Sequence, residues 1–432
     1  MISAGCDKAT VDSERLVAGF VGGGAELALA LDDADVILVN TCGFVDAATR
    51  ESVDAMLRAA RYKESGRCRA VVAVGCLVGL RRDELRRELP EVDYFYGCAD
   101  LASLVPDLVR DGLLAPSPAA HPGERVFFGA RPHVRYLKIS EGCDHGCAFC
   151  AIPLMRGPHR SQPLEALVRE ARLLEAQGAR EINLVAQDLG HYGRDVPGGP
   201  QLPDLVRALL SETAVPWYRM LYVYPAGVTY DLVELLAAEP RLVPYVDMPI
   251  QHASDRVLEA MRRPERGRTV RAKVRRLREA VPGIAIRTTA LVGFPGETDA
   301  EFRELLAFVE EMRFDSLGAF AYSSQDGTAA ARLEDDVPDG LKQDRLAELL
   351  EVQRAVSAEL LAEAVGAEVD VLVDGPADED APAPLAGRTA RQADDVDGCT
   401  YLRSGGPVPA GAFVRGRVVD ALDYDLVAEV LP

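Results

Sequence analysis

The chain has no apolar run long enough to cross a lipid bilayer. Its longest apolar stretch, Val71 to Leu80, is far shorter than a membrane-spanning helix. The N-terminus also lacks the basic start and apolar core of a secretory signal. We therefore expect a cytoplasmic protein with no membrane partner.

Positive charge is also scarce. The 432 residues contain 68 Asp and Glu against 48 Lys and Arg, so the net charge is -20. This balance argues against a protein that coats nucleic acid unaided, and it favours a basic partner. Apolar residues make up 48% and charged residues 27% of the sequence, as in ordinary globular proteins. A globular chain of this length is expected to form about three domains.

The nine cysteines do not form the even set that a disulfide framework needs. In a reducing compartment, thiols more often bind metal or carry out redox chemistry than pair as disulfides. Only Cys143, Cys147 and Cys150 lie close together in the sequence. We call these three residues the loop cysteines.

The first domain is predicted to be a small α/β domain over residues 1–112. Buried strands at Val36–Asn40 and Ala70–Gly75 alternate with amphipathic stretches, and both strands end in a cysteine-bearing turn. Ligands gather at the carboxyl ends of strands in parallel sheets, so these turns are expected to be functional. A linker rich in proline and alanine, residues 113–124, follows.

Two further domains are predicted after the linker, and the whole chain is assigned to the α/β class. Residues 129–360 contain six strand-helix units, which indicate a partial or open parallel barrel. The six strands are expected at His133–Ser140, Glu181–Ala186, Trp217–Tyr222, Tyr245–Ile250, Ile284–Val292 and Leu317–Tyr322. Residues 364–432 are expected to form a small antiparallel β barrel, with residues 374–398 as an acidic loop.

The spacing of the loop cysteines, Cys-x3-Cys-x2-Cys, is the most specific pattern in the chain. Three thiolates in one short loop can hold a four-iron cluster and leave its fourth iron without a protein ligand. The alternative is a zinc site with His145 as the fourth ligand. Zinc favours paired spacings such as Cys-x2-Cys, however, and no second pair is present.

Cys6, Cys42 and Cys76 form a second set, which we call the dispersed cysteines. Each lies beside a glycine or at the end of a predicted strand. Strand ends of a parallel sheet meet at one edge, so these thiols could hold a second iron-sulfur cluster, again with one ligand missing. Three unrelated thiols are the alternative.

Other candidate ligand-binding groups follow later strands of the central domain. Gly293, Gly296 and Glu297 lie after the fifth strand, where glycine permits close approach of the backbone to a ligand. Gln187 follows the second strand. The glycine-rich segment also fits an ordinary turn before a helix, with Glu297 near the helix N-terminus.

With Phe149 before its last cysteine, the loop resembles the signature of radical S-adenosylmethionine (SAM) enzymes. The resemblance implies that the loop cysteines hold a 4Fe-4S cluster that binds SAM and cleaves it reductively to a 5′-deoxyadenosyl radical. It also implies that the SAM site includes Phe149, Gln187, Gly293, Gly296 and Glu297.

Residues 5–14, 40–45 and 74–77 are similar to the N-terminal domain of methylthiotransferases, which are radical SAM enzymes with two clusters. The resemblance implies a second 4Fe-4S cluster on the dispersed cysteines. It identifies the C-terminal barrel as a TRAM domain for substrate recognition. An external electron donor of the flavodoxin or ferredoxin type is also implied.

The ribosomal-protein branch of this family is the one that the chain resembles, through residues 11–14, 42–44, 139–143 and 422–426. That branch modifies the β-carbon of an aspartate in small-subunit ribosomal protein twelve. The other branch modifies an adenosine of transfer RNA and remains the alternative. From Ala364 onward the chain has 13 Asp and Glu against 5 Arg. Such a domain is expected to repel phosphates and to attract a basic protein.

The chain departs from the family pattern at its first cysteine, where the family usually has Gly-Cys-Pro-Lys-Asn. Asp7 and Ala9 replace the Pro and the Asn, and Met1 leaves little room for a first strand. Either the true start lies upstream or this strand is short. Cys68, Cys98 and Cys399 match no family ligand, and we expect them to be ordinary thiols.

Overall fold

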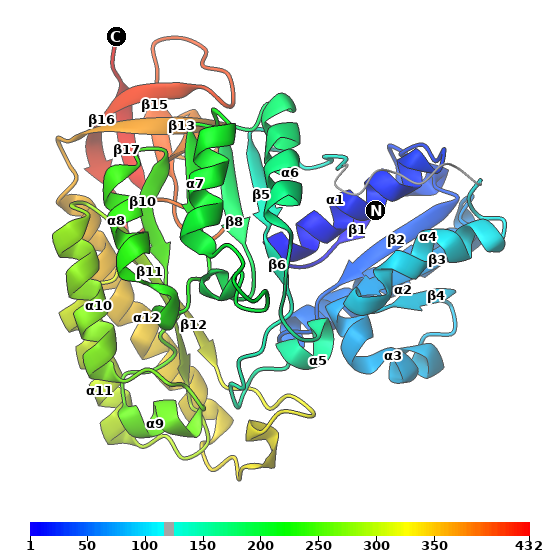
Figure 1. Ribbon diagram of the computed structural model, residues 1–432, viewed down its shortest axis with the longest axis horizontal. Coiled ribbons are helices and arrows are strands. Elements are labelled where there is room, and N and C mark those ends of the chain that lie inside the picture. Colours follow the sequence, from blue (N-terminus) through cyan, green and yellow to red (C-terminus); the bar gives the residue numbers. More distant parts are fainter. Residues whose placement is uncertain (116–124) are drawn as a thin grey trace.

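The computed structural model describes residues 1–115 and 125–432, so most of the expected linker lies outside the described residues. Figure 1 shows an N-terminal α/β domain beside a larger central domain, with a small β barrel at one end of the central domain. The predicted α/β class and its three parts are confirmed. No helix in the described part of the chain is long and apolar enough to span a membrane.

The N-terminal domain contains a parallel sheet in the order β1-β2-β3-β4. Its strands are β1 (Ile2–Ser3), β2 (Val36–Thr41), β3 (Ala70–Gly75) and β4 (Tyr94–Tyr96). Its helices are α1 (Asp7–Gly22), η1 (Leu31–Asp33), α2 (Asp46–Ser65), α3 (Cys76–Glu88), η2 (Cys98–Asp100) and α4 (Leu101–Arg110). Side chains of α1 and α4 cover one face, and those of α2 and α3 cover the other. Burial on both faces explains why the central strands are apolar throughout.

The first strand is short but present. β1 has two residues, and Ile2 pairs with Val39 of β2. The chain then turns at once into α1, which begins directly after Cys6. In this sequence the strand before Cys6 is therefore two residues long.

The central domain is a six-stranded parallel sheet in the order β12-β11-β10-β9-β8-β5. Its strands are β5 (Val134–Lys138), β8 (Glu181–Val185), β9 (Trp217–Met220), β10 (Leu242–Asp247), β11 (Ala285–Val292) and β12 (Ser316–Ala321). β5 and β12 do not pair within the described residues, so the barrel is partial, as predicted. Helices pack on the convex face and bury a large apolar core.

The helices of the central domain follow the predicted alternation with the strands. They are α6 (Leu164–Ala176), η3 (Leu189–His191), α7 (Leu202–Glu212), η4 (Pro225–Gly227), α8 (Tyr230–Ala238), α9 (Asp255–Ala260), α10 (Gly267–Ala280), α11 (Asp299–Met312), η5 (Ala330–Arg332) and α12 (Asp339–Ala362). A small hairpin of β6 (Ser140–Glu141) and β7 (Arg160–Ser161), together with α5 (Ile152–Arg156), frames the loop that carries the loop cysteines.

The C-terminal domain is a closed five-stranded barrel in the order β13-β14-β15-β17-β16. Its strands are β13 (Glu368–Pro376), β14 (Leu385–Thr389), β15 (Thr400–Arg403), β16 (Phe413–Ala421) and β17 (Leu426–Val430). β15 and β17 pair in parallel, and the other pairs are antiparallel. We expected an antiparallel barrel, and the parallel pair of β15 and β17 corrects that expectation.

The expectation that residues 374–398 form a loop is wrong, because β14 lies within this segment. The alternation of apolar and polar residues that marks a strand is missing there, because buried polar side chains of β14 face the central domain. Arg388 is buried, and its Nη1 lies 2.5 Å from Oε2 of Glu181.

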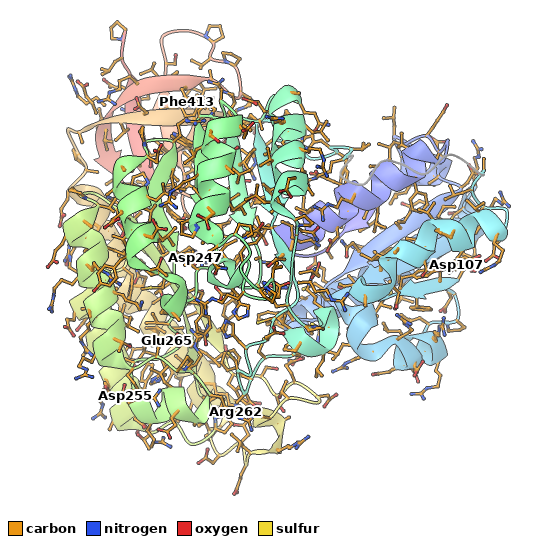
Figure 2. All side chains as sticks on the ribbon, viewed as in Figure 1. Asp107, Asp247, Asp255, Arg262, Glu265 and Phe413 are labelled. Atoms are coloured by element: carbon orange, nitrogen blue, oxygen red, sulfur yellow. The ribbon has the colours of Figure 1, made fainter. Side chains whose placement is uncertain are left out.

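The C-terminal barrel packs against the amino ends of the central strands. The rings of Trp217 and Phe413 lie edge to face with centroids 4.8 Å apart, and the Tyr245 hydroxyl donates to Asp397 (2.7 Å). Figure 2 shows Phe413 at the end of the molecule opposite Asp255, which begins α9 beyond the carboxyl end of β10. The barrel therefore lies away from the carboxyl ends of the strands, where ligands of parallel barrels bind.

Candidate functional site

The loop cysteines lie in a tight loop between β6 and α5. Gly142 precedes the first of them with a φ of +74°, and a Cβ there would collide with the carbonyl oxygen of Pro158. Only glycine allows this close approach. The Cys143 N–H donates to the Gly157 carbonyl (3.1 Å), and the Cys150 N–H donates to the Cys147 carbonyl (3.2 Å). Backbone hydrogen bonds therefore stabilise the conformation of this loop.

The three thiols of this loop lie near enough to influence one another electrostatically. Burial, with a contribution from the neighbouring loop thiols, raises the pKa of Cys143 to about 11 and that of Cys150 to about 12. Three thiolates at such a place need positive charge nearby. An iron-sulfur cluster would supply that charge, so the donor set fits the expected group.

Tyr224 and Arg263 surround Cys147 and were not found from the sequence. The Tyr224 hydroxyl lies 3.8 Å from Cys147 Sγ, and Arg263 Nη1 lies 3.9 Å from the same sulfur. The Arg263 guanidinium lies over the Tyr224 ring, 3.8 Å from its centroid. This arrangement places a positive charge beside a cysteine that is expected to be a thiolate. The two residues are far from the loop in sequence, and no local pattern marks them.

Asp188 ties the cysteine loop to two strands of the central sheet. The side chain of His145 donates to Oδ2 of this buried carboxylate (2.8 Å), and the ring of His145 stacks on Tyr224. Its Oδ1 accepts from the backbone N–H groups of Gly190 (2.9 Å) and Tyr224 (3.1 Å). The contacts of Asp188 therefore fix the ring of His145 beside the cysteine loop.

The dispersed cysteines come together at the carboxyl edge of the N-terminal sheet. Cys42 follows β2, and Cys76 follows β3 as the first residue of α3. Gly75 has a φ of +105°, and a Cβ there would collide with the side chain of Asn40 and the backbone of Thr41. Burial raises the pKa of Cys42, and the nearby thiols of Cys76 and Cys6 raise it further. This second thiol group thus has the same need for positive charge as the first.

A buried network of charges joins the two cysteine sites. Arg156, at the end of α5, donates from Nε to Cys76 Sγ (3.2 Å), and its Nη1 donates to Asp12 (3.1 Å) and to Glu141 (2.9 Å). Lys138 pairs with the same two carboxylates. Glu141 directly precedes the glycine that opens the cysteine loop. The network therefore links a dispersed cysteine to the loop that carries the loop cysteines.

Cys98, which the sequence indicated as an ordinary thiol, lies beside Cys76 of the dispersed cysteines. Its Sγ is 3.9 Å from Cys76 Sγ. A hydrogen bond with Cys98 and the Arg156 guanidinium lower the pKa of Cys76, whereas its burial has the opposite effect. Both neighbours therefore favour the thiolate form of Cys76, which is the form that binds iron.

The structure places four predicted SAM-site residues beyond the carboxyl ends of central strands, and the fifth, Phe149, within the cysteine loop. Glu297 is buried and holds its own turn: Oε2 accepts from the Gly293 N–H (2.7 Å), and Oε1 accepts from Arg345 (3.0 Å). Gly293 packs so closely on Lys342 of α12 that a Cβ would collide with it. Phe149 packs beside an apolar cluster around Phe294. The remaining predicted residues, Gln187 and Gly296, follow β8 and β11.

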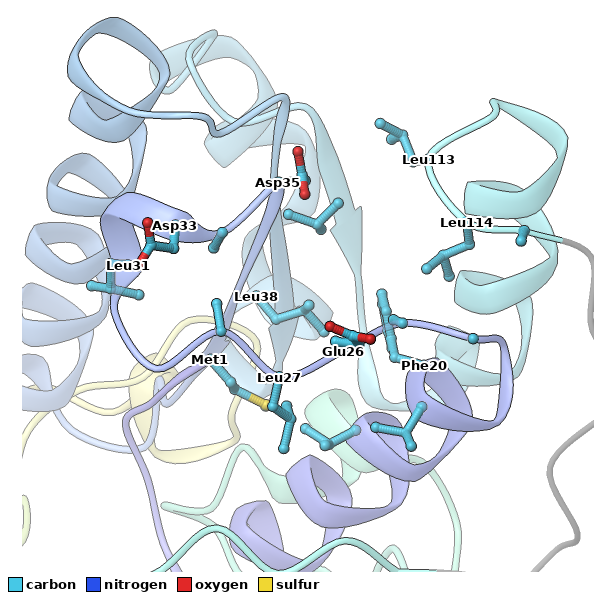
Figure 3. Close-up of a pocket in the computed structure, with 18 of the residues that line it drawn as sticks. Met1, Phe20, Glu26, Leu27, Leu31, Asp33, Asp35, Leu38, Leu113 and Leu114 are labelled. Atoms are coloured by element: carbon cyan, nitrogen blue, oxygen red, sulfur yellow. The ribbon is translucent and has the colours of Figure 1, made fainter.

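A separate pocket of about 330 Å³ lies in the N-terminal domain, between α1, the segment after it and β2. Figure 3 shows Met1, Phe20, Glu26, Leu27 and Leu38 among the residues that line it. No cysteine is among its lining residues. This pocket is therefore distinct from both cysteine sites.

Comparisons with known proteins agree with the three parts of the fold. Residues 137–309 match the Radical SAM superfamily, residues 1–97 match Uncharacterized protein family UPF0004, and residues 365–431 match the TRAM domain. The fold is similar to the radical S-adenosylmethionine methyltransferase TsrM from Kitasatospora setae. The TM-score is 0.53 at 14% identity, over 80% of this chain and 81% of that chain. The fold is thus that of a radical SAM enzyme.

Full-length relatives define the family more closely. The chain is 46% identical to ribosomal protein uS12 methylthiotransferase RimO of Desulforudis audaxviator (strain MP104C), over 100% of this chain and 96% of the relative. It is 45% identical to the protein of the same name from Anaeromyxobacter sp. (strain K), over 100% of this chain and 92% of the relative. The chain belongs to the radical SAM methylthiotransferase family, in its ribosomal protein uS12 branch.

Proposed function

We propose that this chain transfers a methylthio group to the β-carbon of an aspartate in ribosomal protein uS12. The observation that carries the proposal is the pair of three-cysteine sites joined by Arg156, in a chain with full-length relatives named uS12 methylthiotransferases. Radical SAM enzymes need one such site. A second site fits an enzyme that must also bind the sulfur that it transfers to its substrate.

Each cysteine site holds one 4Fe-4S cluster in this proposal. The loop cysteines are Cys143, Cys147 and Cys150, and the dispersed cysteines are Cys6, Cys42 and Cys76. With three thiolates each, both clusters keep one iron free of protein ligands. When bound, the clusters and SAM supply a radical that removes a hydrogen atom and a methylated sulfur that replaces it.

The chain's own residues hold and shield these groups. Asp188 and Tyr224 fix the cysteine loop, and Arg156 fixes Cys76 and joins the two domains. The SAM site is proposed to include Phe149, Gln187, Gly293, Gly296 and Glu297. In this set Glu297 acts through the turn that it holds, because its carboxylate is already bound by the chain.

Two partners complete the proposed reaction. The substrate is the basic protein uS12, and the acidic C-terminal domain favours it over a phosphate backbone. The other partner is a one-electron donor of the flavodoxin or ferredoxin type, and the reaction takes place in the cytoplasm. We assign residues 1–112 to the second cluster, residues 129–360 to the radical SAM core and residues 364–432 to substrate recognition.

Iron and acid-labile sulfide per chain, measured after anaerobic reconstitution, test the two-cluster proposal. We expect about eight irons in the parent and about four in either Cys42→Ala or Cys147→Ala. Cys42→Ala should keep SAM cleavage and lose the methylthio product, whereas Cys147→Ala should lose both. About four irons in the parent, with Cys42→Ala fully active, would contradict the second cluster.

Product analysis tests the substrate. We expect a methylthio group on uS12 and none on a transfer-RNA anticodon arm offered under the same conditions. The reverse result would establish the transfer-RNA alternative. Zinc without iron or sulfide would exclude radical chemistry altogether.

A further inference from the structure

Lys8 is a buried cation, at the junction of the N-terminal and central domains, that the reaction above does not use. It lies two residues after Cys6, and its side chain is only 7% exposed. The Lys8 ammonium lies over the ring of Tyr222, 3.3 Å from the centroid. Lys8 belongs to the N-terminal domain and Tyr222 to the central domain, so this contact crosses the junction between them.

Tyr222 lies just beyond the carboxyl end of β9, where ligands of parallel barrels bind. Its backbone has a φ of +65°, in the left-handed region that side chains disfavour. The Tyr222 N–H donates to the buried carboxylate of Asp247 (3.2 Å), which also pairs with Arg287 (3.2 Å). Such strain persists where the surroundings fix it, and it is common at functional sites.

The hydrogen-bonding capacity around Lys8 is incompletely used. Asp7 is its only carboxylate partner among residues 1–115 and 125–432, with Oδ1 3.0 Å from the ammonium. The Asp7 side chain is 8% exposed, and its Oδ2 is buried without a hydrogen-bond partner among the described residues. An ammonium has three donors and a carboxylate several acceptor positions. The Asp7–Lys8 pair can therefore bind one further anion and one further cation.

We propose that Lys8 binds the carboxylate of the target aspartate and that Asp7 binds a basic side chain beside it in the same substrate. The inference rests on the proposed function and gives it a specificity-determining pair. The carboxylate is one bond from the carbon that reacts, so a cation at this place both selects and orients the target. An adenosine ring has no carboxylate, and the pair therefore disfavours the transfer-RNA alternative.

The test is a binding comparison on the reconstituted enzyme with two peptides from uS12. One peptide carries the target aspartate, and the other carries asparagine in its place. We expect the parent to bind the aspartate peptide about tenfold or more tightly than the asparagine peptide. Lys8→Gln should remove this difference and leave the affinity for the asparagine peptide unchanged, whereas Lys8→Arg should retain most of it.

Lys63→Gln is the matched control. Lys63 lies in the same domain and pairs with Asp93 at the surface, so this change should leave both affinities unaltered. Equal weakening of both peptides by Lys8→Gln would overturn the inference, because a merely structural lysine acts on both alike. If Lys8→Gln lost iron, the binding comparison on the parent enzyme would still test the inference. Equal affinity of the parent for the two peptides would contradict recognition of the carboxylate.

Failure of the inference is distinguishable from failure of the proposed function. A parent with about eight irons that binds uS12 peptides without discrimination contradicts the role of Lys8 only. A parent with about four irons, or one that binds neither peptide, contradicts the proposed function and the inference with it.

Discussion

The two cysteine sites differ in how the chain builds them. The loop cysteines come from residues 143–150, and one turn of backbone brings them together. The dispersed cysteines come from residues 6–76 and meet only because β1, β2 and β3 are parallel neighbours. The first site thus depends on local geometry, whereas the second depends on the register of a sheet.

The difference extends to what surrounds each site. The cysteine loop is held by Asp188, Tyr224 and Arg263, which all belong to the central domain. Cys76 is held by Arg156, which comes from the other domain. We therefore expect that a break in domain packing damages the dispersed site before the loop site.

Arg156→Met should have the largest effect and would test this order. The change removes a donor to Cys76 and leaves Asp12 and Glu141 with less compensation in a buried place, which costs about 3–5 kcal/mol. Iron should fall from about eight toward about four per chain, with SAM cleavage retained. The measurements are iron content, 5′-deoxyadenosine formation and the free energy of unfolding.

Arg86→Met is the control for that experiment, because Arg86 is exposed on α3, in the same domain as Cys76. It should change neither iron content nor stability. If Arg156→Met kept all its iron and lost SAM cleavage instead, the proposed order of dependence would be wrong.

Asp188→Asn should affect only the site of the loop cysteines, and its effect should be smaller than that of Arg156→Met. An amide keeps the shape of the carboxylate but cannot accept on both sides, so either His145 or the backbone donors lose their partner. Changes of this kind around a metal site cost about tenfold or more in affinity or activity. We expect SAM cleavage to fall about tenfold, and Asp231→Asn, in an exposed pair with Arg207, to have no effect. Loss of iron from the dispersed site would contradict the expectation.

These contrasts also explain which features the sequence could predict. The loop cysteines follow one another within eight residues, and so their spacing alone indicated the cluster. The dispersed cysteines needed the additional argument that parallel strands end at one edge. Arg156, Tyr224 and Arg263 could not be found, because each acts on a cysteine through tertiary packing. The contact of Cys98 with Cys76 could not be found for the same reason.

The fold shows a similar limit. The strands of the central domain were predicted within a few residues, because each is a buried apolar run between helices. β14 was missed because its polar side chains, Arg388 among them, are buried against another domain. Apolar patterning reports a domain's own core and says little about polar interfaces.

Acid should weaken the junction in a defined pH range. Burial alone would raise the pKa of Glu141, but Lys138 and Arg156 lower it from 4.5 to about 2. A carboxyl group with a depressed pKa stabilises the fold above its unfolded pKa, and this contribution is lost as the pH falls toward the folded value. We therefore expect Glu141 to contribute stability above pH 4.5 that disappears between pH 4.5 and 2.

Urea unfolding of the chain without added iron, at several pH values, measures this contribution. Glu141→Gln should be less stable than the parent near neutral pH, and the difference should shrink as the pH approaches 2. Glu310→Gln, an exposed change on α11, should follow the parent at every pH. A difference that is constant with pH would show that Glu141 acts by shape and not by charge.

Cys98→Ala should have the smallest effect. This change tests whether Cys98 binds iron itself or only contacts the ligand Cys76. The dispersed site already has three thiols, and Cys98 Sγ lies only 3.9 Å from Cys76 Sγ. Iron content and product formation should therefore stay within about twofold of the parent. The midpoint potential of the second cluster should become slightly more negative, since hydrogen bonds to ligand sulfurs help to set that potential. Redox titration followed by electron paramagnetic resonance measures the shift, with Cys68→Ala as the control. Loss of about four irons in Cys98→Ala would instead show that Cys98 is a ligand. The proposal that one iron of the second cluster lacks a protein ligand would then be wrong.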